Sequence, residues 1–181
     1  LARDRDDERS RLRSQVYRQC RNADCADGLL ACDSPVGSGK TTAVMAHLLR
    51  AAEKKRLRRV FVVLPFTNII DQSVDVYRKA LIRATESTGE VVAAHHHRAE
   101  FDAPAARQYS FLWHAPIVVT TAVQFFETLA ARSPAAIRKL HQLPGSAIFI
   151  DEAHAALTAP LWPQAWLWLQ ALQRDWNCHI V

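Results

Sequence analysis

The apolar residues of this chain fall into short continuous runs separated by longer stretches in which they recur at helical spacing. Continuous runs rich in β-branched residues predict buried strands, and they cover 28–34, 59–65, 91–94, 116–121, 146–154 and the last residues 178–181. Helical spacing predicts helices over 42–55, 68–82, 122–132, 134–143 and 160–174. Strands that alternate with helices predict an α/β fold with a mostly parallel sheet and helices on both of its faces.

The amino-terminal segment differs from the rest because it is highly charged. Over 6–23 it predicts an amphipathic helix whose apolar positions are Leu12, Val16, Tyr17 and Cys20. We expect 1–27 to form a helical lead-in and 28–181 to form one domain. The chain does not begin with methionine and ends inside the apolar run 178–181, so we expect a piece of a longer protein.

Composition narrows the class of protein. The 181 residues are 49% apolar and 23% charged, which is ordinary for a globular domain and excludes intrinsic disorder, a collagen and a disulfide scaffold. Apolar runs are too short for a membrane span, so we expect no membrane partner. The net charge of +5 fits a polyanionic partner without proving one. The four cysteines are scattered, and we expect free, buried thiols.

Candidate chemistry begins with the segment SPVGSGKT, Ser34 to Thr41, which lies between a predicted strand and a predicted helix. This is the context of a phosphate-binding loop, where glycines let backbone N–H groups converge on phosphates. We expect Lys40 to reach the β- and γ-phosphates of ATP and the Thr41 hydroxyl to bind Mg²⁺. The strict motif begins with glycine, where this chain has Ser34. The expected cofactor-binding residues are Ser34, Pro35, Val36, Gly37, Ser38, Gly39, Lys40, Thr41 and Thr42.

A second candidate feature is the acidic sequence Asp151-Glu152-Ala153-His154, which follows the apolar residues of a predicted strand. We expect Asp151 to hold Mg²⁺ through water and Glu152 to orient or deprotonate the attacking water. His154 is expected to couple the site to a neighbouring element. A salt-bridged surface turn is the alternative interpretation, and the phosphate-loop motif argues against it. The expected catalytic residues are therefore Lys40, Asp151, Glu152 and His154.

The two motifs together resemble those of superfamily-two helicases and translocases of the DEAD/DEAH class, whose first RecA-like lobe carries both. The resemblance implies a RecA-like P-loop domain. It also implies nucleic-acid backbone contacts after two strands, at Pro65, Thr67, Asn68, Thr120 and Thr121. In this superfamily a glutamine upstream of the loop often recognises adenine, and Gln15 and Gln19 are both candidates.

Longer strings narrow the resemblance to one branch. LPFTNIIDQ, HHHRAE, WHAPIVVTTAVQFFETL, RKLHQLPGSAIFIDEAHA and PLWP resemble the CRISPR-associated helicase of type I systems. This implies the ATP-binding lobe of a DNA helicase in antiviral defence, with single-stranded DNA, the Cascade surveillance complex and a second RecA-like lobe as partners in a prokaryotic cytoplasm. The HD nuclease motif, the S-A-T motif and the second lobe are missing, so 28–181 would be lobe 1 truncated before the S-A-T motif.

Several alternatives remain open at this stage. The parent protein could be a general DEAH-type helicase or a restriction-system translocase acting on DNA or RNA. The chain could also bind nucleotide or nucleic acid with little turnover by itself. The run His95–His97 lacks the aspartates of a metal-dependent nuclease, so we interpret it as a polar loop. The tryptophans Trp162, Trp166 and Trp168 suit base stacking or packing, and we expect packing.

Overall fold

The computed structural model describes residues 2–26, 28–82, 91–95 and 113–181. Helices are labelled α, and the two short 3₁₀ helices are labelled η. In chain order the elements are α1 (Ala2–Asn22), α2 (Lys40–Lys55), β1 (Arg59–Leu64), η1 (Thr67–Ile69), α3 (Ile70–Leu81), β2 (Val92–His95), β3 (Ile117–Thr121), α6 (Ala122–Leu129), α7 (Pro134–Leu140), β4 (Ser146–Ile150), α8 (Ala153–Ala156), η2 (Ala159–Leu161), α9 (Trp162–Asp175) and β5 (His179–Ile180).

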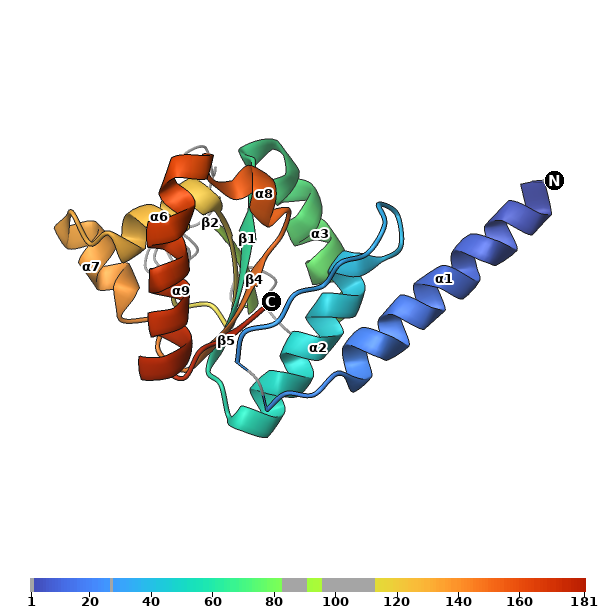
Figure 1. Cartoon of the computed structure of the whole chain (residues 1–181), viewed down its shortest axis with the longest axis horizontal. Helices are drawn as coiled ribbons and strands as arrows, with labels where there is room; N and C mark the ends of the chain where they lie inside the picture. The colour runs from blue at the N-terminus through green and yellow to red at the C-terminus, as the bar shows by residue number, and fades with distance from the viewer. Residues whose placement is uncertain (1, 27, 83–90, 96–112) are drawn as a thin grey trace.

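The strands of the described chain form one five-stranded sheet in the order β2-β3-β1-β4-β5, and every pairing in it is parallel (Figure 1). β1 lies at the centre, where Val62 pairs with Val119 of β3 and with Phe149 of β4. Parallel strands need long crossover connections, and helices supply them here. The predicted fold class, an α/β domain of RecA-like type with helices on both faces of a parallel sheet, is confirmed.

Two apolar layers hold the sheet between the helices, and β1 contributes to both by alternation. Phe61 and Val63 pack in the layer that contains residues of α6 and α9. Val60, Val62 and Leu64 pack in the other layer, with residues of α2 and α3. Because both faces are covered, the sequence of β1 is continuously apolar rather than alternating. The site described below lies at the carboxyl edge of this sheet.

Two of the predicted strands differ from the structure. The segment 28–34 makes a single parallel bridge, Leu29 with Ile180, and otherwise lies outside the sheet. Its backbone hydrogen bonds to β5 are those of Leu30 N–H with Ile180 and of Ile180 N–H with Gly28. The strand predicted over 146–154 stops at Ile150, because Glu152 has φ +47°, a left-handed conformation that cannot continue a strand.

The helix predicted over 6–23 is present as α1, and its carboxyl-terminal half packs along α2 (Figure 1). Arg50 of α2 donates hydrogen bonds to the carbonyl oxygens of Arg21 and Ala23, which anchors this end of α1. Val16 is buried as predicted, but Tyr17 is 39% exposed, so the expectation that it belongs to the apolar face is wrong. Among the described residues, no helix combines the length and apolar character needed to cross a bilayer.

The four cysteines are free, as predicted, but only two of them are fully buried. Cys25 and Cys178 are buried, whereas Cys20 and Cys32 are half-buried. The Sγ atoms of Cys20 and Cys32 lie 3.8 Å apart, one on α1 and the other in the segment that leads to the glycine-rich loop. The contact between Cys20 and Cys32 adds to those that hold α1 against the domain.

Candidate functional site

The glycine-rich loop has the backbone conformation that its sequence predicts. Gly37 and Gly39 both adopt φ +80°, a region that side chains with a Cβ rarely enter. The Ser38 N–H donates to the Pro35 carbonyl at 3.2 Å, and the hydroxyls of Ser34 and Ser38 lie 2.5 Å apart. Gly39 precedes α2 and provides no side-chain cap, so the first N–H groups of α2 are left for an anion.

The two carboxylates of the site come from the turn that follows β4. The Asp151 N–H donates to the Val63 carbonyl at 2.9 Å, which fixes this turn against the end of β1. The Glu152 N–H donates to its neighbour Asp151 Oδ1 at 3.0 Å. With the left-handed conformation of Glu152, these contacts hold both carboxylates at the carboxyl edge of the sheet, where ligands bind in open α/β folds.

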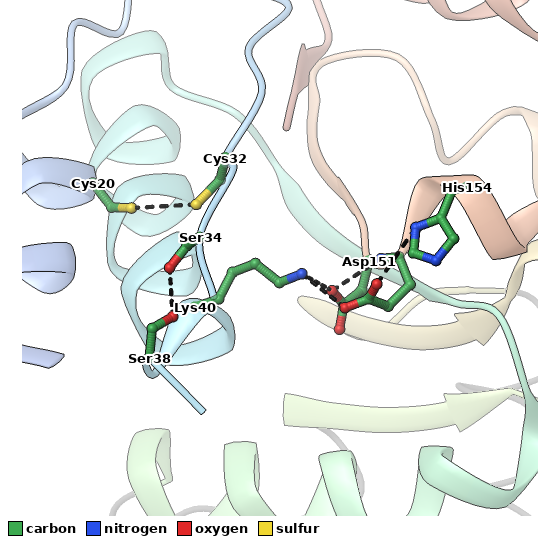
Figure 2. A network of polar contacts seen from close by, with 8 residues as sticks. Cys20, Cys32, Ser34, Ser38, Lys40, Asp151 and His154 are labelled. Atoms are coloured by element: carbon green, nitrogen blue, oxygen red, sulfur yellow. Dashed lines mark hydrogen bonds and ion pairs between the residues drawn. The ribbon is translucent and has the colours of Figure 1, made fainter. Parts of the chain in front are cut away.

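Lys40 joins the loop to the two carboxylates (Figure 2). Its Nζ atom lies 2.9 Å from Glu152 Oε1 and 3.2 Å from Asp151 Oδ1. Partial burial acts to lower the pKa of Lys40, but the hydrogen bond that Lys40 donates to Glu152 and the charge of Asp151 outweigh it, so the pKa is raised. The same hydrogen bond from Lys40 lowers the pKa of Glu152. Both groups are therefore charged at neutral pH.

His154 lies at the outer side of the same cluster. Its Nδ1 atom is 3.5 Å from Glu152 Oε2, the carboxylate oxygen that does not contact Lys40 (Figure 2). The His154 side chain is 79% exposed, so this contact is weak in water. It places His154 beside the carboxylate, as the prediction of a coupling role requires, and the role itself stays a prediction.

A pocket of about 1040 Å³, which we call the loop pocket, opens in front of these groups. Most predicted cofactor-binding residues line it together with both carboxylates; these are Pro35, Val36, Gly37, Gly39, Lys40, Thr41, Thr42, Asp151 and Glu152. Its volume is at the upper end of ordinary ligand pockets. An uncapped helix start, a lysine, a hydroxyl and a carboxylate form a donor set that fits a nucleotide phosphate and Mg²⁺, with Thr41 and Asp151 as the residues that could hold the metal.

Ser34 and His154 lie instead on a second pocket of about 710 Å³, which we call the tryptophan pocket. Trp162 and Trp166 of α9 form part of its wall, and Lys40 and both carboxylates line it as well. Trp162 packs edge-to-face on Phe126, with ring centroids 6.4 Å apart, which agrees with the expectation that it serves packing. Trp166 is 48% exposed, so part of this wall is open.

The predicted nucleic-acid residues lie at the carboxyl ends of β1 and β3, where Leu64 pairs with Thr121. All of them except Thr120 meet at a third pocket of about 420 Å³, the threonine pocket, lined by Pro65, Phe66, Thr67, Asn68, Thr121, Val123 and Gln124. The Thr121 hydroxyl accepts the Gln124 N–H at 3.2 Å and so caps α6. Thr120 is fully buried and does not line this pocket, and its assignment to nucleic-acid binding stays a prediction.

The loop-pocket residues missed by sequence reasoning are on α1 and α3. Arg13, Ser14, Tyr17 and Arg18 of α1 line the pocket, and so do Gln72, Ser73 and Val76 of α3. Gln15 and Gln19, the two candidates for adenine recognition, do not. The pocket-lining residues of α1, at i, i+1, i+4 and i+5, form one stripe of the helix. Nothing in the sequence shows which stripe of α1 faces the loop.

Comparison with known proteins agrees with this geometry. The chain matches the DEAD/DEAH box helicase family over residues 14–174. The CRISPR-associated nuclease/helicase Cas3 of Haloferax volcanii is 25% identical to it over 168 residues, which cover 81% of this chain and 18% of that relative. The chain therefore spans less than a fifth of that relative's length. Since the family match extends over the loop, the strands β1 to β4 and both carboxylates, the chain belongs to the DEAD/DEAH box helicase family, whose members are ATP-dependent hydrolases.

Proposed function

We propose that this chain is the ATP-binding lobe of an ATP-dependent DNA helicase or translocase, and that the parent protein is a CRISPR-associated type I effector in antiviral defence. The observation that carries the ATP site is the contact of Lys40 with both Asp151 and Glu152 at the mouth of the loop pocket. The CRISPR assignment is supported by the similarity to the Haloferax volcanii relative. In this proposal 1–27 is a helical lead-in and 28–181 is lobe 1.

The site residues would divide the work of binding and hydrolysis. The loop N–H groups and Lys40 would bind the phosphates, and Lys40 would leave the carboxylates to do so. Thr41 and Asp151 would hold magnesium, which supplies positive charge against the phosphate oxygens. Glu152, once released from Lys40, is free to accept a proton from water at Oε1. His154, which lies beside Oε2 of Glu152, would couple the site to a neighbouring element.

The threonine pocket is where we place the nucleic acid in this proposal. Its hydroxyl and amide side chains, from Thr67, Asn68 and Thr121, suit contacts with a phosphate backbone. Such contacts carry no sequence information, so binding should be insensitive to sequence and should weaken with salt. The second RecA-like lobe would complete the ATP site, and the Cascade complex would deliver the DNA. We propose these partners, and a location in a prokaryotic cytoplasm, from the resemblance to the family and its CRISPR-associated branch.

The test is the ATPase rate of the full-length protein with no nucleic acid, with single-stranded DNA and with single-stranded RNA. Stimulation by DNA and not by RNA is the expected result, because the two differ in the 2′-hydroxyl and so in their contacts with a protein. Stimulation by RNA would favour a general DEAH-type helicase. Stimulation by neither, with basal ATPase intact, would refute the DNA motor and leave the ATP site.

A second candidate function, nucleotide binding with little turnover, is favoured by one feature of the site. Lys40 is neutralised by two carboxylates in this conformation, so the lobe by itself holds its own catalytic groups together. Comparing turnover by this chain with turnover by the full-length protein separates the candidates. Equal rates per molecule would show that the second lobe contributes nothing to hydrolysis. A large deficit in the chain alone would support the composite site.

A further inference from the structure

Arg13 connects α1 directly to the glycine-rich loop. Its Nε atom donates a hydrogen bond to the Gly37 carbonyl oxygen at 3.2 Å, across 24 positions of the sequence. Its aliphatic stem lies over Gly39, where an added Cβ would be 3.4 Å from Arg13 Cγ. We propose that Arg13 is a positioning residue that orients the Gly37–Ser38 peptide for phosphate binding. This inference rests on the ATP-binding function proposed above and adds a residue to it.

The geometry of a peptide explains how Arg13 acts. In a planar trans peptide the carbonyl oxygen and the N–H point in opposite directions. The Gly37 oxygen is held toward α1 by Arg13, so the Ser38 N–H of the same peptide points to the opposite side. There it donates to the Pro35 carbonyl at 3.2 Å, across the loop. Arg13 and the Pro35 carbonyl therefore hold the two polar ends of this peptide and together set its orientation.

The two ends of this peptide are held differently: inside the loop the Ser38 N–H is bonded to the Pro35 carbonyl and Ser38 is buried, whereas the Gly37 side is open. A Cβ at Gly37 would have no atom within 4 Å, and the preceding Val36 is fully exposed. Glycine also has the lowest cost for rotating its flanking peptides. Among the described residues, the Arg13 guanidinium is the group outside the loop that contacts the Gly37 oxygen. Without it, the peptide loses one of the two hydrogen bonds that fix its orientation and keeps the bond from Ser38 to Pro35.

Arg13 is well placed for this task because the far end of α1 is anchored. Arg50 donates to two carbonyl oxygens at that end, those of Arg21 and Ala23. His47 Nδ1 lies 2.9 Å from the Cys20 carbonyl oxygen and adds a third contact. A positive charge on the carbonyl side of a peptide also makes its N–H a stronger donor. Because the Arg13 contact is exposed, we expect its loss to weaken phosphate binding by about three- to tenfold.

The experiment measures dissociation constants for Mg–ATP, Mg–ADP and adenosine in the full-length protein. The variants are Arg13→Ala, Arg13→Lys and the matched control Arg11→Ala, which removes the same charge from an exposed position of α1. We expect Arg13→Ala to weaken ATP and ADP by about three- to tenfold while adenosine is unchanged, because adenosine has no phosphate. Arg13→Lys should recover part of the loss, and Arg11→Ala should match the wild type.

Three outcomes would overturn the inference. Unchanged ATP and ADP affinities in Arg13→Ala would show that the loop does not need this contact. An equal loss for adenosine would show that Arg13 acts on the nucleoside or on the docking of α1, and a lowered thermal midpoint in both Arg13 variants would point to docking. If the wild-type protein binds neither ATP nor ADP, the proposed function fails and the inference fails with it, which distinguishes that case from the first.

Discussion

Replacing Glu152 by glutamine should move ATP affinity and ATP turnover in opposite directions. The substitution removes one negative charge but keeps the side-chain length and an oxygen that can accept a hydrogen bond from Lys40. In the structure Glu152 and Asp151 both contact the lysine that we propose for the phosphates. The carboxylates and the phosphates therefore compete for one cation, and the variant weakens one competitor.

The exposure of the ion pair limits the gain in affinity. The side chains of Lys40 and Glu152 are 22% and 41% exposed, and their contact is 2.9 Å long. A pair this accessible to water contributes about 0.2–1 kcal/mol, so losing it should tighten ATP binding by at most about fivefold. Asp151 remains 3.2 Å from Lys40 and continues to hold it. Turnover should fall about 10²–10⁴-fold, because a general base is lost.

Two assays on the full-length protein separate these effects: an equilibrium titration with Mg–ATP and a single-turnover measurement of hydrolysis. Glu53→Gln, an exposed carboxylate at the other end of α2, is the matched control and should change neither. The reasoning is refuted if Glu152→Gln weakens ATP binding more than about tenfold, because the carboxylate would then assist binding rather than compete with it. Turnover within tenfold of wild type would show that Glu152 is not the base.

Three further predictions concern the fold that carries the site. Burial is the main cause that lowers the pKa of His47 below its ordinary 6.5. The unfolded chain therefore binds a proton at His47 more readily than the folded chain does. The free energy of unfolding should have its full value above about pH 6.5 and should fall by up to about 1.4 kcal/mol per pH unit below it. Urea titrations from about pH 5 to 8 should show a shallower pH dependence in His47→Gln, and an identical one would disprove the assignment. Phe125 is fully buried beside Phe126, so Phe125→Ala should lower the free energy of unfolding by about 3–5 kcal/mol. A decrease below about 1 kcal/mol would contradict its place in the core. Thr121→Val should lose about 0.5–2 kcal/mol with the cap of α6, whereas Thr121→Ser should keep it; equal losses would show that the hydroxyl is not the stabilising group.

The glycine-rich loop and the acidic turn could be predicted from the sequence because their chemistry is local. Glycine is favoured where the backbone adopts positive φ, as it does at Gly37 and Gly39, and Lys40 follows them directly. β1 could be predicted for a similar reason, since a strand covered on both faces is apolar throughout. Glu152, in contrast, is left-handed without being glycine, and the sequence gives no sign of that conformation.

The parts that could not be predicted depend on contacts between distant segments. Whether 28–34 becomes a strand depends on its pairing with β5, which is distant in the sequence, and the segment itself does not encode that pairing. His47 lies 2.8 Å from His179, 132 positions later, so its buried surroundings are a tertiary fact. The same holds for Arg13, because only the docking of α1 against α2 decides which of its arginines meets the loop.

The central claim is that the loop pocket binds ATP through Lys40. Its most direct test is an equilibrium titration of Mg–ATP into the full-length wild-type protein, Lys40→Ala and the control Lys54→Ala, which changes an exposed lysine of the same helix. Removing Lys40 deletes the cation and leaves Asp151 and Glu152 unneutralised before an anionic ligand. We predict binding by wild type and Lys54→Ala, with affinity lost by well over tenfold in Lys40→Ala. Equal affinity in all three, or no binding by the wild type, would contradict the account.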